Sequence, residues 1–212
     1  MRSVRVALAA GLTLLICALV LTLLGSPLTV ASTDKVRGAE AQIASTTRGT
    51  TYCQGGETLP QGTTAIRVWL DAAAGPRVSV VVSAGGRTIA HGERGSVWIG
   101  GSVTVPLAPL PRTVSGTTVC VSFPLHDESV VVQGRTSSPA VAAREGQQPL
   151  SGRIWIDYLR PGTRSWLSMV TEVARRMGLG RASAGTWVAP AALALVAAAL
   201  VLASRLLIKE LA

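Results

Sequence analysis

Residues 65–71 (AIRVWLD) and 118–123 (TVCVSF) decide the fold of this chain. In both stretches a large apolar side chain falls at every second position: Ile66, Val68 and Leu70 in the first, and Val119, Val121 and Phe123 in the second. This alternation is typical of β-strands that bury one face. The same period recurs at 77–86, 102–107, 128–134 and 153–159, with shorter runs at 87–91 and 97–99.

Glycine and proline bound these runs, and no helical pattern lies between them. Six to eight short strands in this order predict a mainly β domain, an antiparallel β-sandwich or jelly roll, over 52–160. Residues 134–152 read as a long loop between the last two strands.

Two apolar segments flank the predicted domain, at Val6–Gly25 and Thr186–Ser204. Each is about as long as a helix that crosses the hydrocarbon core of a bilayer. Basic residues outside the segments place both chain ends in the cytoplasm and the β domain outside the plasma membrane. A signal peptide cleaved after Ala31 is the alternative for the first segment.

The resulting organisation has six parts. They are a cytoplasmic end with the first transmembrane helix (1–25), a linker (26–51), the extracytoplasmic β-sandwich (52–160), an amphipathic juxtamembrane helix (161–181), a linker with the second transmembrane helix (182–204), and a cytoplasmic tail (205–212).

The formal net charge of +9 is concentrated beside the apolar segments. Residues 26–159 hold eleven basic and nine acidic side chains, a balance of only +2. Nucleic-acid binding requires a basic face on the folded domain, so we exclude that class of partner. Basic residues beside apolar segments favour anionic lipid headgroups, which makes membrane lipids an expected partner.

Two of the three cysteines, Cys53 and Cys120, lie in the predicted domain, and Cys17 lies in the first apolar segment. An oxidising compartment permits a disulfide between the first two, and the alternative is a pair of unbonded thiols. Two distant histidines add no recognisable metal pattern. We therefore expect a Cys53–Cys120 bond and neither a metal nor a cofactor.

Residues 163–178 follow a helical period, with apolar side chains on one face and arginines opposite. The face and its surroundings predict a helix at the membrane interface, with Trp187 beside the second apolar segment. A helix packed under the sandwich, or in the groove of a partner subunit, would use the same apolar face. The predicted interface residues are Trp166, Met169, Val170, Val173, Arg175, Arg176, Met177 and Trp187.

Motifs for catalysis are absent from the sequence, including nucleophile elbows, phosphate-binding loops and zinc-protease signatures. The one cluster of acid–base residues is His126, Asp127 and Glu128, in a predicted loop. Such a group can transfer protons, but a loop also carries these side chains for solubility. We assign no catalytic residue, and we keep a hydrolase acting on envelope polymers as the alternative function.

Trp69 and Trp155 fall on the faces opposite to the aliphatic residues of their strands. Arg67, Asp71 and Asp157 share those outward positions. A sugar stacks its C–H face on an aromatic ring while its hydroxyls need polar partners, so these five residues form a candidate glycan-binding site. The alternative is that both indoles are covered within the protein.

Three quoted stretches resemble uncharacterised two-span envelope proteins of high-GC bacteria: YCQGGETLPQGTTAIRVWL (52–70), PLPRTVSGTTVCVSF (109–123) and RIWIDYLRPGTRSWLSMVTEVARRMGLG (153–180). The resemblance implies an extracytoplasmic β-sandwich and no activity. Together the features predict a non-enzymatic binding or assembly subunit, accessory to an envelope glycan or transport machine. Expected partners are membrane lipids, another membrane protein and an envelope glycan.

Overall fold

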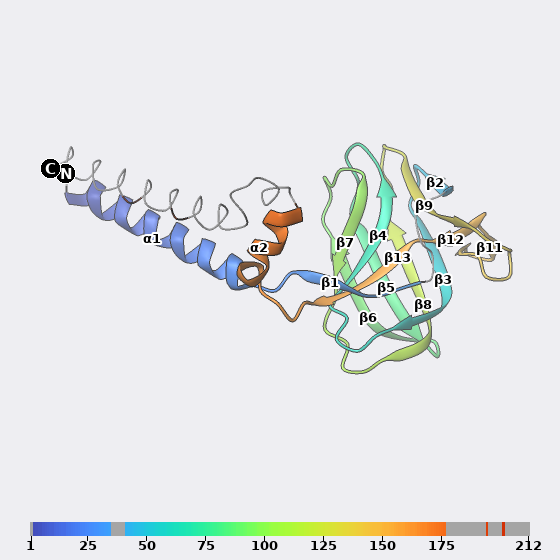
Figure 1. Cartoon of the computed structure of the whole chain (residues 1–212). Helices are drawn as coiled ribbons and strands as arrows, with labels where there is room; N and C mark the ends of the chain where they lie inside the picture. The colour runs from blue at the N-terminus through green and yellow to red at the C-terminus, as the bar shows by residue number, and fades with distance from the viewer. Residues whose placement is uncertain (1, 35–40, 177–193, 195–200, 202–212) are drawn as a thin grey trace. The chain divides into compact units, whose positions relative to one another are not determined.

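The alternating stretches of the sequence are strands in the computed structural model, which describes residues 2–34, 41–176, 194 and 201 (Figure 1). Within this part of the chain there are two helices, α1 (Arg2–Leu24) and α2 (Trp166–Arg176), and thirteen strands. The strands are β1 (Leu28–Thr33), β2 (Ala41–Thr46), β3 (Thr50–Leu59), β4 (Ala65–Asp71), β5 (Val78–Ala84), β6 (Arg87–Arg94), β7 (Gly101–Pro106), β8 (Val114–Phe123), β9 (Val130–Thr136), β10 (Arg144–Glu145), β11 (Gln148–Pro149), β12 (Gly152–Ile154) and β13 (Ile156–Pro161).

The strands form two sheets in which every pairing between named strands is antiparallel. A seven-stranded sheet has the order β1-β13-β4-β9-β12, with β2 also paired to β9 and β7 to β4. A six-stranded sheet has the order β11-β10-β3-β8-β5-β6. The prediction of a mainly β, antiparallel domain is therefore confirmed.

One hydrophobic core joins residues of both sheets. Ile66, Val68 and Leu70 of β4 are buried, as are Val119 and Val121 of β8. The outward positions between them stay partly or fully exposed, which gives β4 and β8 the alternating burial that the sequence predicts. Removing this apolar surface from water stabilises the fold by about 25 cal/mol per Å².

A disulfide bonds the two sulfurs of Cys53 on β3 and Cys120 on β8, so that prediction is confirmed. These residues lie directly opposite each other in the β3–β8 pairing, with their Cα atoms 4.0 Å apart. Cys17 on α1 is a free thiol.

Residues Leu28–Pro161 form one compact unit, which begins and ends on paired strands because Leu28 lies opposite Pro161. The predicted domain over 52–160 misses β1 and β2, which lie in the segment predicted as a linker. The predicted loop over 134–152 contains the short strands β10 and β11. The predicted short strand at 97–99 is instead a loop in which Trp98 makes one bridge to Gly75.

The second unit contains α1 and α2. Helix α2 begins at Trp166, three residues later than predicted. Its predicted apolar face is not uniformly covered: Trp166 and Val173 are exposed, while Met169 and Val170 are half-buried. The structure does not describe Met177 or Trp187, or the side chains of the predicted interface arginines, Arg175 and Arg176. The role of this face at a membrane stays a prediction from the pattern.

No helix formed by the described residues is both long enough and apolar enough to cross a membrane. The predicted localisation, a plasma-membrane protein with two spans, both ends cytoplasmic and the main domain extracytoplasmic, is therefore wrong. The second predicted span, 186–204, lies outside the described residues except for Ala194 and Val201.

Candidate functional site

Four of the five predicted glycan-binding residues come together on the outer face of the seven-stranded sheet. The rings of Trp69 and Trp155 stack with their centroids 4.2 Å apart and their planes 19° from parallel. The guanidinium carbon of Arg67 lies 5.8 Å from the centroid of the Trp69 ring, within the range of a cation–π contact. With Asp157, these residues form what we call the indole surface: Arg67, Trp69, Trp155 and Asp157.

The pairing of β4 with β13 creates this arrangement. Asp157 lies opposite Arg67 and Ile156 lies opposite Val68, so Trp155 comes beside Trp69 at the next position. The aliphatic residues between them point into the core. Because side chains alternate between the two faces of a strand, the two indoles and the two charged groups must then share the outer face.

Hydrogen bonds to the Asp157 carboxylate fix the indole surface. Arg67 donates from Nε and Nη2 to Oδ2 of Asp157, at 3.1 and 2.6 Å. Trp155 donates from its indole nitrogen to the other carboxylate oxygen, at 3.2 Å. Asp157 is itself only 4% exposed, so this charge-assisted network is shielded from water and is stronger than a surface ion pair.

Two donors of the indole surface have no acceptor among the described residues. Nη1 of Arg67 makes no hydrogen bond there, although the side chain is 28% exposed. The indole nitrogen of Trp69 is buried and also lacks a partner. The first donor belongs to a partly exposed side chain, whereas the second is covered.

The fifth predicted residue, Asp71, does not join the indole surface. It is exposed at the end of β4, where its carboxylate lies against the backbone of Gly100: a Cβ added at Gly100 would fall 2.0 Å from Oδ1 of Asp71. The sequence pattern placed Asp71 on the outer face of β4. It could not show that β4 ends at Asp71, beside the loop that contains Gly100.

A second polar group, which the sequence analysis missed, is buried where the two sheets meet. Asp34, Gln54 and Glu57 are 6%, 0% and 3% exposed. The amide nitrogen of Gln54 donates to Oδ2 of Asp34 and to Oε1 of Glu57, at 2.9 Å each. Arg153 forms an ion pair with Glu57, and the Tyr158 hydroxyl donates to Oε2 of Glu57 at 2.8 Å.

Burial, followed by the charge and hydrogen bond of Glu57, raises the pKa of Tyr158 well above its usual value. Tyr158 therefore stays protonated and acts as a donor in this buried group.

A cavity of about 410 Å³ opens beside these buried groups. Both sheets contribute to its wall, through residues 32–34 at the end of β1, 56–58 of β3, 135–137 at the end of β9, and Arg153 of β12. Its volume lies within the usual range for small-molecule sites. The sequence pattern offers no signal for this group: Gln54 and Glu57 are three positions apart, so a period of two would put them on opposite faces, and both are buried because the β3–β8 pairing is irregular between them.

The acid–base residues of the alternative hydrolase function do not converge. The two ring nitrogens of His126 face the backbone carbonyl oxygens of Pro124, at 2.6 Å, and Thr46, at 3.2 Å. Glu128 accepts a hydrogen bond from the backbone nitrogen of Ala74 at 2.8 Å. Asp127 is exposed, and none of the three predicted residues lines the 410 Å³ cavity. Their observed contacts hold loops together.

Among the described residues, no group of three or more histidine, cysteine, aspartate and glutamate side chains is arranged to hold a metal ion. A scan against protein-family models and searches of curated proteins and of solved structures find no match to this chain. The geometry of the indole surface and of the cavity is therefore the basis for assigning a role.

Proposed function

We propose that the two sheets form a β-sandwich that acts as a non-enzymatic glycan-binding domain, accessory to a machine that builds or moves glycans. The indole surface would be the contact. The observation that carries the proposal is the stacked pair of Trp69 and Trp155, held beside the Arg67–Asp157 ion pair on the outer face of a sheet.

The chemistry of a sugar suits this surface. A pyranose ring has an apolar C–H face that packs on an indole, and a rim of hydroxyls that require hydrogen-bond partners. The two rings give one face to each other, so a sugar must use a face outside the stack. Nη1 of Arg67 can then donate to a hydroxyl of the same sugar, because it has no partner among the described residues.

The fixed position of Trp155 also favours binding. Its indole nitrogen is already bonded to Asp157, so the ring does not have to be ordered when a ligand arrives. Immobilising a side chain on binding costs about 0.5–1.5 kcal/mol, and a side chain that is ordered beforehand avoids this cost.

The test compares glycan binding by the full chain and by two tryptophan variants. We expect the wild-type chain to bind oligosaccharides on a glycan array, and Trp155→Ala to weaken that binding at least tenfold, a loss of about 1.4 kcal/mol. Trp166→Ala is the matched control, because Trp166 is 47% exposed on α2, outside the sheets.

Thermal melts of both variants would show whether the sheets still fold. Equal binding by Trp155→Ala and Trp166→Ala would contradict the proposal, and so would a wild-type chain that retains no glycan on the array.

A further inference from the structure

The cavity beside Asp34 and Glu57 has the features of a second ligand site. Its polar floor is already ordered: Oε1 of Gln54 accepts a hydrogen bond from the backbone nitrogen of Ile154 at 2.7 Å. This bond fixes the orientation of the amide, so the NH₂ group must face the two carboxylates. The floor is therefore in place before any ligand enters, which lowers the cost of binding.

Among the described residues, the charges that line the cavity cancel. Asp34 and Glu57 are acidic, Arg135 and Arg153 are basic, and all four side chains belong to the lining. A charged ligand would be attracted by one of these pairs, the carboxylates or the guanidinium groups, and repelled by the other. A neutral ligand would meet no net charge from these four side chains, and it could still accept hydrogen bonds from guanidinium groups and donate them to carboxylates.

Hydroxyl groups dominate the rest of the lining. They belong to Ser32, Thr33, Thr58, Thr136 and Ser137. A hydroxyl both donates and accepts, so this rim matches a ligand that itself presents hydroxyls in several directions. Thr58 and Thr136 are exposed at the cavity. Their hydroxyls form no hydrogen bond with any described residue.

We propose that this cavity binds one neutral sugar unit, held between the carboxylates and arginines of its wall and the hydroxyls of its rim. The inference rests on the proposed function for the class of ligand, but it assigns a different set of residues.

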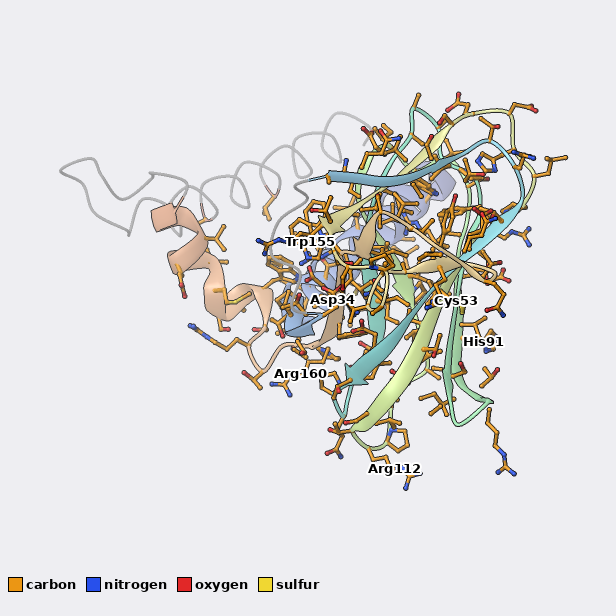
Figure 2. All side chains as sticks on the ribbon, turned by 90° about the vertical axis from the view of Figure 1, so that its right-hand side faces the viewer. Asp34, Cys53, His91, Arg112, Trp155 and Arg160 are labelled. Atoms are coloured by element: carbon orange, nitrogen blue, oxygen red, sulfur yellow. A yellow bond between two sulfur atoms is a disulfide. The ribbon has the colours of Figure 1, made fainter. Side chains whose placement is uncertain are left out.

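The two sites share a strand pairing. Thr33, which lines the cavity, lies opposite Asp157 of the indole surface in the pairing of β1 with β13. The backbone nitrogen of Asp34 donates to the carbonyl of Ile156, next to Trp155, at 3.1 Å. Figure 2 labels Asp34 and Trp155 on these adjoining segments. The two candidate sites are therefore connected through one strand pairing.

Gly56 offers a variant that adds a side chain at the wall of the cavity. It lines the cavity, its φ is +75°, and a Cβ added there meets no atom within 4 Å. Asparagine tolerates this left-handed conformation better than other residues with a side chain. Gly62→Asn is the matched control, because Gly62 has a φ of +77° and the same open space but does not line the cavity.

The experiment measures binding of monosaccharides to the full chain by saturation-transfer NMR and calorimetry. The probes are glucose, galactose, mannose and N-acetylglucosamine, with glucosamine and glucuronate as charged comparators. We expect at least one neutral sugar to bind, Gly56→Asn to weaken that binding at least tenfold, and Gly62→Asn to leave it unchanged. Melting curves confirm that both variants fold.

Several outcomes would overturn the inference: no neutral sugar binds, Gly56→Asn binds as tightly as wild type, or glucuronate or glucosamine binds at least tenfold more tightly than the best neutral sugar. Oligosaccharide binding separates the two sites. If Trp155→Ala loses oligosaccharide binding and Gly56→Asn binds as the wild-type chain does, the cavity is rejected as a sugar site and the proposed function stands. If Gly56→Asn loses binding and Trp155→Ala does not, the indole surface is rejected and the cavity stands.

Discussion

Val97 has the one positive φ among the non-glycine residues that the structure describes, at 68°. This conformation is costly for a β-branched side chain, by about 1–3 kcal/mol. The adjacent Trp98 explains why it is adopted: its ring is 6% exposed, its indole nitrogen donates to the carbonyl of Pro76 at 2.6 Å, and it packs on Gly75. Burying Trp98 forces the strained turn and leaves Val97 80% exposed.

Replacing Val97 with glycine should stabilise the protein. The change removes the left-handed strain of about 1–3 kcal/mol and loses about 0.5–1 kcal/mol through the greater freedom of glycine in the unfolded chain. We expect a net gain of about 1 kcal/mol in the free energy of unfolding, measured by urea denaturation. Ile99→Ala, at an exposed position of the same loop, should change little. A lower stability of Val97→Gly would mean that the valine side chain makes a favourable contact that outweighs the strain.

Tyr158 should make stability depend on pH in the alkaline range. Burial raises its folded pKa above the unfolded value of 10.0, so above that pH the unfolded chain holds fewer protons than the folded one. The contribution of Tyr158 to the free energy of unfolding is fully present below about pH 10 and declines as the pH rises further.

We expect Tyr158→Phe to be less stable than the wild-type chain at neutral pH by about 1 kcal/mol, because Glu57 loses the hydrogen bond from the tyrosine hydroxyl. We also expect its stability to fall less steeply between about pH 9.5 and 11. Parallel pH profiles from urea titrations would contradict this assignment.

At the scale of elements, the sequence predicted those strands whose inward positions carry valine, isoleucine or leucine. Strands β4 and β5 are of this kind, because their large apolar residues alternate over the whole strand. Strands β1 and β2 read LTVAST and AQIAST, in which small and polar residues hide the period of two. These strands are held by pairing with β13 and β9, which is a tertiary contact that no local pattern contains.

The disulfide between β3 and β8 should be a major source of stability. Its cysteines are 67 residues apart in the sequence, and a closed loop of that length is worth about 4 kcal/mol in the chain-entropy model. We expect Cys53→Ala/Cys120→Ala to lower the free energy of unfolding by about 2–4 kcal/mol. Equilibrium denaturation without reductant measures this loss, and Cys17→Ser is the control with an unchanged bond. Equal stability of the double variant and the control would show that the hydrophobic core alone holds the two strands.

At the scale of the molecule, the candidate site was predictable only in part. The outward positions of Arg67, Trp69 and Trp155 follow from the strand period, but their contact depends on the register between β4 and β13. The group around Gln54 and Glu57 joins segments from both sheets, about 100 residues apart at Ile154 and Tyr158. Residues so distant in sequence meet only through the packing of the sheets, which periodicity does not specify.

The central claim is that a sugar contacts the indole surface, and the indole N–H signals of the full chain in a ¹⁵N-correlation NMR spectrum test it most directly. The chain has five tryptophans. During titration with an oligosaccharide selected from the array, we predict that the Trp155 signal shifts most and the Trp69 signal shifts with it. The Trp98 signal should stay in place, since Trp98 is buried and does not belong to the indole surface. A titration in which neither Trp155 nor Trp69 moves, or in which Trp166 alone moves, would contradict the account.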